Sequence, residues 1–157
     1  MDLLNPEYLA FFSCAEKNKL RYLMIGGYAV NYYGYNRNTH DLDIWLAPTN
    51  ENRGNFINTL ICMGYSKGEV SSLYDDDFTK HFVGSVGNNL ALLEFLTYVH
   101  EKISFDEAEK DLIIHKIDED IIVKLVPYNF LMDMKLFSRR DKDLIDIAQL
   151  DKLNKKL

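Results

Sequence analysis

The chain has 157 residues, of which 47% are hydrophobic and 13% aromatic; this predicts one folded domain over residues 1–157 and excludes a disordered chain. Its net charge of −6 argues against non-specific nucleic-acid binding, although residues 123–157 carry 8 basic and 5 acidic side chains and leave room for a local phosphate site. Because the sequence contains no run of about 18 apolar residues and no signal-peptide pattern, we expect a cytoplasmic protein with no membrane partner.

The first part of the chain predicts two helices and two short strands. Asn5-Pro6 is a typical helix start, since Asn caps the first turn and Pro fits its first position, and helical apolar spacing continues to about residue 18. An apolar strand over 21–25 then ends at Gly26-Gly27. A short helix over 28–33 and a strand over 42–46 follow.

The remainder predicts further helices alternating irregularly with strands. Thr49 is expected to cap a helix that runs to about residue 63, and Ser104 with Glu107 has the pattern of a helix-capping box. The other expected elements are a polar loop over 68–77, paired strands over 78–83 and 90–98, a hairpin of 112–117 with 121–126, and helices over 127–137 and 141–153. This order predicts an α+β fold, a mixed β-sheet with helices packed on it, and not a doubly wound one.

Cys14 and Cys62 have neither metal-type spacing nor a partnering motif. We therefore expect two reduced, partly buried thiols.

The segment from Gly26 to Asp43 carries the predicted chemistry. A Gly-Gly pair directly after a strand allows a sharp turn and close approach of the backbone to a ligand such as phosphate. Asp41 and Asp43, two positions apart on a strand, point to the same face. Two carboxylates that converge there need a cation in order to stay ionised together, and oxygen-only ligands favour Mg²⁺ or Mn²⁺ over zinc.

Glu94 is the best candidate for a third carboxylate. It lies in the middle of an apolar predicted strand, where an unpaired charge is costly, so it is expected to be either structurally paired or functional. A third carboxylate would complete a two-metal arrangement.

These motifs resemble the minimal nucleotidyltransferase (polymerase-beta-like) superfamily, in which Gly-Gly precedes Arg-x-Thr-x-Asp-hydrophobic-Asp-hydrophobic. The chain looks most similar to the abortive-infection toxin type and to the small antibiotic nucleotidyltransferases. Those relatives also have a late lysine before a Lys/Arg-Asp-x-x-Asp helix. The matching residues here are Gly26, Gly27, Arg37, Thr39, Asp41, Leu42, Asp43, Ile44, Lys135, Lys142, Asp143 and Asp146.

The resemblance implies a nucleotidyltransferase fold whose helices from about residue 127 complete the site. The implied reaction transfers a nucleoside monophosphate from an NTP to a hydroxyl of a small molecule, RNA or protein, and releases pyrophosphate. Two alternatives are a non-catalytic nucleotide-sensing or partner-binding module on the same fold, and the toxin half of a toxin–antitoxin pair with a cognate antitoxin.

The resemblance also assigns a role to each residue. Asp41 and Asp43 would hold metal, and Glu94 would bind a second metal or help to deprotonate the acceptor. The implied nucleotide-binding residues are Gly26 and Gly27 at the β- and γ-phosphates, Arg37 and Thr39 beside them, and Lys135 as a mobile cation. Asp143 and Asp146 would orient Lys135 or Arg37, and Lys142 would support the same region.

Overall fold

A mixed β-sheet organises the protein, whose computed structural model describes residues 3–155. Its strands are β1 (Tyr22–Ile25), β2 (Asp41–Leu46), β3 (Val83–Asn88), β4 (Ala91–Leu96), β5 (Ile113–Lys116) and β6 (Ile122–Leu125). Their order across the six-stranded sheet is β3-β4-β2-β1-β6-β5. β1 pairs with β6 and β2 with β4 in parallel, whereas the other neighbouring strands are antiparallel.

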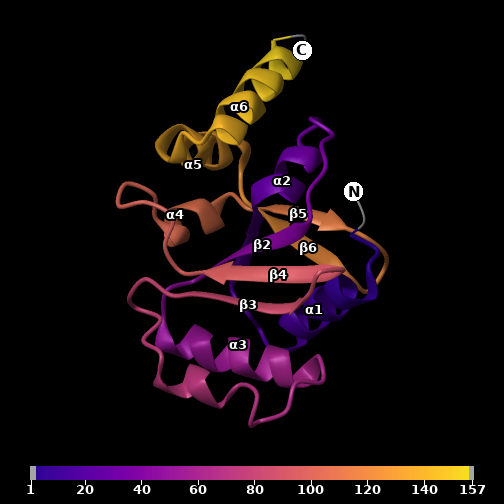
Figure 1. Cartoon of the computed structure of the whole chain (residues 1–157), viewed down its shortest axis with the longest axis vertical. Helices are drawn as coiled ribbons and strands as arrows, with labels where there is room; N and C mark the ends of the chain where they lie inside the picture. Colours follow the sequence, from indigo (N-terminus) through magenta and orange to yellow (C-terminus); the bar gives the residue numbers. More distant parts are fainter. Residues whose placement is uncertain (1–2, 156–157) are drawn as a thin grey trace.

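Helices cover both faces of the sheet. They are α1 (Pro6–Lys17), α2 (Gly26–Tyr32), α3 (Asn50–Cys62), α4 (Phe105–Lys110), α5 (Tyr128–Ser138) and α6 (Asp141–Asn154), with a 3₁₀ turn η1 (Ser71–Asp75). α3 lies on one side of the sheet, and α5 and α6 lie on the other (Figure 1). The expected α+β fold with a mixed sheet is therefore confirmed. Within residues 3–155, the structure contains no helix with the length and apolar character that crossing a bilayer requires.

Period-two alternation in β2 separates the core from the site. Leu42, Ile44 and Leu46 are fully buried in a hydrophobic cluster with side chains of α1 and α3. Asp41 and Asp43 point to the opposite face, as alternation along a strand requires. The apolar face of β2 thus packs into the core, and its acidic face lies beside α2, α5 and α6.

The expected helix N-caps are present, but only half of the Ser104–Glu107 capping box forms within the described residues, since the Glu107 side chain pairs with Lys110. The side-chain oxygens of Asn5, Thr49 and Ser104 accept hydrogen bonds from backbone N–H groups in the first turns of α1, α3 and α4. The hairpin β5–β6 also forms as expected. Helix α2 begins at Gly26, two residues earlier than the predicted 28–33 segment.

The predicted strand over 78–83 is wrong, because the hairpin partner of β4 is β3, from Val83 to Asn88. The Phe78 ring is fully buried against Phe82, and its backbone N–H donates to the Asn50 side chain at 2.9 Å. The Phe78 side chain therefore belongs to the core beneath the sheet, outside the ladder. β3 itself has the sequence VGSVGN, which lacks the apolar alternation that would identify a strand.

The expectation of two reduced thiols is also wrong. Cys14 on α1 and Cys62 at the end of α3 form a disulfide, with their Cα atoms 5.7 Å apart and a sequence separation of 48. Packing of α1 beside α3 brings these distant positions together. Spacing along the chain carries no information about that packing.

Candidate metal and nucleotide site

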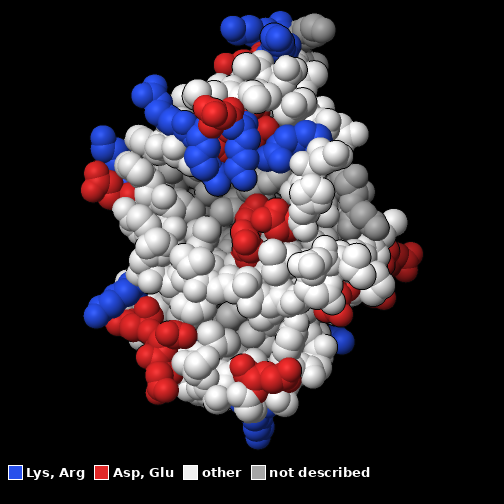
Figure 2. All heavy atoms as spheres, in the orientation of Figure 1, with Lys and Arg blue, Asp and Glu red and all other residues white. Residues whose placement is uncertain are grey.

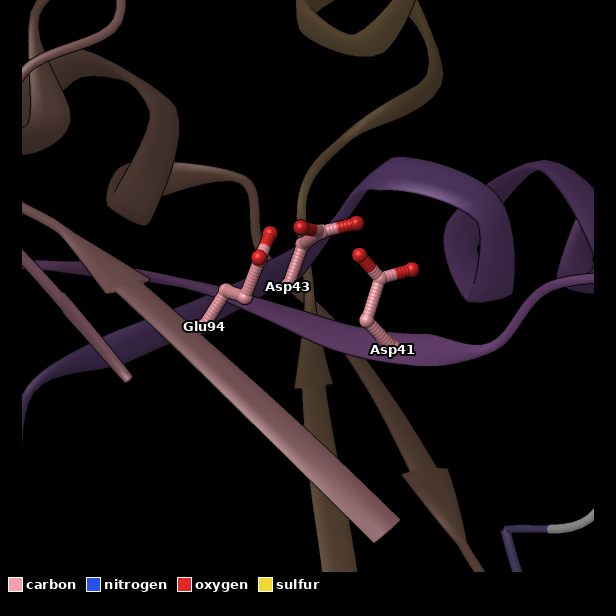
Figure 3. Close-up of side chains that lie close together, drawn as sticks. All are labelled: Asp41, Asp43 and Glu94. Carbon is pink, nitrogen blue, oxygen red and sulfur yellow. The ribbon is translucent and has the colours of Figure 1, made fainter. Parts of the chain in front are cut away.

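Three carboxylates converge on one face of the sheet. Asp43 on β2 is paired in register with Glu94 on the parallel strand β4, and Asp41 lies two positions earlier on β2. One ligand oxygen from each of Asp41, Asp43 and Glu94 lies within 4.8 Å of the others. Figure 3 shows the three side chains rising from the two strands toward one another. The sheet register therefore assembles the cluster that the sequence predicted only as separate parts.

The electrostatics of this cluster favour a bound cation. Burial, followed by the charges of Asp41 and Glu94 and a hydrogen bond with Glu94, raises the pKa of Asp43 to about 7. Lys142 opposes this shift in part. A divalent cation would remove the repulsion, and a set of carboxylate oxygens suits Mg²⁺ or Mn²⁺. The residues present thus fit the metal that the sequence predicts.

The two glycines make room for the site. Gly26 has a φ of +69°, and a side chain on it would collide with the Asp43 carboxylate. A Cβ on Gly27 would lie 2.5 Å from Thr39 Oγ1 and 3.3 Å from an Arg37 guanidinium nitrogen. Their contact with phosphate remains a prediction, but the close approach of the backbone to site residues is evident.

A chain of alternating charges lies behind the carboxylates. Asp146, which is fully buried, accepts from Arg37 Nε at 2.8 Å and from Lys135 Nζ at 2.7 Å. Lys135 also donates to Asp143 at 3.2 Å, and Asp143 accepts from Arg140 Nε at 2.8 Å. This network joins the loop that carries Arg37 to α5 and α6. The pairing of Asp143 and Asp146 with Lys135 and Arg37 has the contacts that the sequence analysis expected.

Asp143 is held in its ionised form. Its burial alone would raise the pKa, but hydrogen bonds from Arg140 and Ser138, together with the charge of Lys135, lower the pKa to about 2. Lys135 is only 6% exposed and already has two carboxylate partners. It is therefore a fixed cation, in contrast with the mobile one that the sequence suggested.

Two adjoining hollows flank the aspartates. One, of about 300 Å³, includes Glu94 and apolar side chains of α5; the other, of about 260 Å³, includes Gly27, Arg37 and Thr39. The residues common to both are Gly26, Asp41, Asp43, Lys135, Arg140 and Lys142. Figure 2 shows acidic side chains in a hollow on this face, with basic side chains gathered along the side where α5 and α6 lie.

Every predicted site residue lies at these hollows except one. Asp146 lies behind them and reaches the site only through Arg37 and Lys135. The predicted residues that line the hollows are Gly26, Gly27, Arg37, Thr39, Asp41, Asp43, Glu94, Lys135, Lys142 and Asp143.

Arg140 was missed by the sequence reasoning. It lines both hollows, and its guanidinium interacts electrostatically with Asp43. The available signal was its position three residues before Asp143, because residues three apart at the start of a helix lie on the same face. Lys142 is exposed and makes no ion pair within the described residues, so its charge is available to a ligand.

No family model matches the sequence, and no curated protein shows significant sequence similarity to it.

Proposed function

We propose that this protein is a metal-dependent nucleotidyltransferase with the minimal nucleotidyltransferase (polymerase-beta-like) fold. The observation that carries the proposal is the convergence of Asp41, Asp43 and Glu94 to within 4.8 Å, beside a hollow lined by basic side chains. Carboxylates on one side and cations on the other suit a metal-bound triphosphate. The proposed reaction transfers a nucleoside monophosphate to a hydroxyl and releases pyrophosphate.

The acidic cluster would hold the metal. Asp41 and Asp43 would bind Mg²⁺ or Mn²⁺ through carboxylate oxygens, with Glu94 completing the set or accepting the proton of the acceptor hydroxyl. Bound there, the metal would stabilise charge on the attacking and leaving oxygens. Burial and the charges of Asp41 and Glu94 disfavour the ionised form of Asp43, and a bound cation would offset this cost.

The cations would divide into two groups by their mobility. Lys142, which is exposed and makes no ion pair within the described residues, is free to turn toward phosphate oxygens. The side chain of Arg140 is 62% exposed, but its Nε is bound to buried Asp143 at 2.8 Å. Lys135 and Arg37 are tied to buried carboxylates, so they would supply a fixed positive potential at the floor of the hollow. This arrangement supports binding of a triphosphate without reorganisation of the buried network.

A labelled transfer assay tests the proposal. Purified protein is incubated with each α-labelled NTP and Mg²⁺ or Mn²⁺, and the acceptor panel contains RNA, aminoglycosides, lincosamides, neutral glycosides, nucleosides and the protein itself. We expect label transfer and pyrophosphate release with wild type, and loss of both by at least a hundredfold in Asp43→Asn. Asp133→Asn is the matched control, because Asp133 is an exposed aspartate on α5.

Two results would contradict the proposal. Full activity of Asp43→Asn, with folding verified by circular dichroism, would refute the metal-site assignment. Tight binding of Mg-NTP without pyrophosphate release for any acceptor in the panel would instead support a nucleotide-binding module.

A further inference from the structure

A further cavity lies next to the acidic cluster but outside it. Its volume is about 460 Å³, and it lies between the start of α1, the loop before β2 and the β3–β4 turn. Its lining residues are Asn5, Tyr8, Tyr28, Asn36, Arg37, Asn38, Thr39, His40, Asn89 and Leu90. Apart from Arg37 and Thr39, these residues have no role in the proposed metal and phosphate chemistry.

The cavity is rich in amides whose hydrogen-bonding capacity is unused. Asn36, Asn38 and Asn89 are exposed, and their side chains make no hydrogen bond to another residue within the described chain. Each amide offers two donor hydrogens and one acceptor oxygen. Asn5 is different, because its side chain already accepts from Glu7 N at 2.9 Å. Three free amides around one cavity suit a ligand with many hydroxyl groups.

The lining is almost neutral. Among the described residues, Arg37 is the only Lys, Arg, Asp or Glu in it, and its guanidinium is held by Asp146 through bonds of 2.8 and 3.1 Å. The neighbouring hollow that contains Gly27, by contrast, has three further basic side chains: Lys135, Arg140 and Lys142. Within residues 3–155, the lining of this cavity offers a polyanion no free Lys or Arg, and it offers a polycation no carboxylate.

The floor of the cavity is rigid. The Tyr8 and Tyr28 rings are buried and meet edge to face with centroids 5.7 Å apart, and Tyr8 Oη donates to the Leu92 carbonyl at 3.3 Å. A ligand must therefore enter between the loop and the turn that carry the free amides.

The cavity continues into the site. It shares Arg37, Asn38, Thr39 and His40 with the hollow that contains Gly27, which Asp41 and Asp43 also line. It shares no residue with the hollow that contains Glu94. A molecule seated among the amides can therefore extend one group past Thr39 and His40 toward the two aspartates.

We propose that this cavity binds the acceptor, and that the acceptor is a neutral polyhydroxylated molecule. The inference rests on the proposed nucleotidyltransfer. In that reaction the hollow that contains Gly27 and the basic side chains binds the triphosphate, and the neutral cavity is left for the second substrate. The acceptor oxygen would form a bond to the α-phosphorus while the bond to the β-phosphate oxygen breaks. Pyrophosphate leaves, and the hydroxyl proton passes to a carboxylate of the acidic cluster.

Glycosides and nucleosides share this hydroxyl chemistry, so raffinose and uridine serve as the two probes. Kanamycin and a short RNA oligonucleotide serve as the cationic and anionic comparisons. ¹⁵N-labelled protein is titrated with each probe in EDTA, and the side-chain amide signals are assigned with single Asn→Ala variants. We expect the signals of Asn36, Asn38 and Asn89 to shift with raffinose or uridine and not with kanamycin or RNA.

The variants give the quantitative test. The double variant Asn38→Ala/Asn89→Ala removes two amides and should weaken binding of the responding probe about tenfold. Asn129→Ala, an exposed Asn on α5, should leave it unchanged. In the transfer assay with that probe as acceptor, the double variant should raise the KM for the acceptor about tenfold and the KM for NTP less than twofold.

The outcomes separate this inference from the proposed function. Amide signals that respond to no neutral probe, or respond only to kanamycin, RNA or NTP, would overturn the acceptor assignment even if Asp43-dependent transfer is observed. Amide shifts in EDTA together with full transfer activity of Asp43→Asn would refute the nucleotidyltransferase site and leave the cavity as a separate binding site. A rise in the KM for NTP instead of the acceptor would make the cavity part of the donor site and would also overturn the inference.

Discussion

Asp43 and Glu94 lie opposite each other on the parallel strands β2 and β4, and their carboxylates share a hydrogen bond. Burial, with Asp41 and Glu94 as neighbours, places the pKa of Asp43 at about 7, near physiological pH. Between about pH 4 and 7, Asp43 therefore keeps a proton in the folded protein that it loses in the unfolded chain. This difference couples protonation, metal binding and folding at one residue.

The first prediction concerns this coupling. Because the folded pKa of Asp43 lies above its unfolded value of 3.8, the metal-free protein should lose stability as pH rises from about 4 to about 7. The loss should be on the order of 4 kcal/mol and should be reversed by millimolar Mg²⁺ or Mn²⁺. Thermal unfolding in EDTA and in metal, at pH 5.5 and 8, measures both effects.

The control for the pH prediction is Asp43→Asn. This variant cannot ionise, so its stability should vary less with pH, and it should exceed wild type at pH 8 in EDTA. Added metal should also stabilise this variant less than it stabilises wild type. Equal pH dependence in the two proteins would show that Asp43 is not the group responsible.

The second prediction concerns Gly26. An alanine there would have a strained φ of +69° and a Cβ in contact with the Asp43 carboxylate. Gly26→Ala should therefore lower the free energy of unfolding by about 1–3 kcal/mol and weaken Mn²⁺ binding in calorimetry. Gly54→Ala is the matched control, since nothing lies within 4 Å of its added Cβ and alanine favours the helix α3. Equal Mn²⁺ affinity in both variants would contradict the prediction.

Local patterns in the sequence were sufficient for the elements with strong signals. Asn5-Pro6 and Thr49 locate two helix starts because capping is a short-range effect. The alternation of Asp41-Leu42-Asp43 likewise identifies both the core face and the acidic face of β2. These features depend on neighbours within a few residues.

Features that depend on packing between distant segments could not be predicted from local patterns in the sequence. β3 contains two glycines and alternates poorly, and its place in the sheet comes from pairing with the apolar strand β4. The fixed state of Lys135 depends on α6 folding back on α5 to bring Asp143 and Asp146 to it. A motif of the same spacing on an isolated helix would leave that lysine exposed.

The third prediction compares two lysines. Lys135→Met would leave Asp143 and Asp146 buried with one cation fewer, and it should reduce the free energy of unfolding by about 3–5 kcal/mol. Lys142→Met should leave the unfolding free energy unchanged, because Lys142 is exposed. It should instead weaken NTP binding several-fold, since its charge is available to phosphate. Urea unfolding and calorimetry with Mg-NTP distinguish the two effects.

A different result for the lysines would revise the division of roles. If Lys135→Met unfolded at the same urea concentration as wild type but lost NTP affinity, Lys135 would be the mobile phosphate ligand. The fixed-cation assignment would then be wrong.

The fourth prediction concerns acid. The pKa of Asp143 lies at about 2 because Arg140, Ser138 and Lys135 stabilise its ionised form against the effect of burial. A depressed folded pKa contributes stability above the unfolded value of 3.8, and this contribution is lost as pH falls toward 2. Asp143→Asn should therefore cost about 2 kcal/mol at pH 7 and progressively less between pH 4 and 2. Urea unfolding at several pH values tests this, with the exposed Asp151→Asn as control.

The fifth prediction concerns the disulfide. Cys14 and Cys62 close a loop across 48 residues, so reduction should lower the free energy of unfolding by about 2–4 kcal/mol through the greater freedom of the unfolded chain. The double variant Cys14→Ser/Cys62→Ser should lose a similar amount and become insensitive to reductant. Thermal unfolding with and without reductant gives the comparison.

The effect of reduction should be confined to stability. The disulfide joins α1 to α3, which pack against Leu42 and Ile44, on the face of β2 opposite Asp41 and Asp43. Mn²⁺ affinity of the folded double variant should therefore equal that of wild type in calorimetry at low temperature. Alkylation of denatured, unreduced protein provides the direct check, because both thiols should be protected in wild type. Modification of both cysteines without reductant would refute the bond, and a large loss of Mn²⁺ affinity in the double variant would show that the two faces of the sheet are coupled.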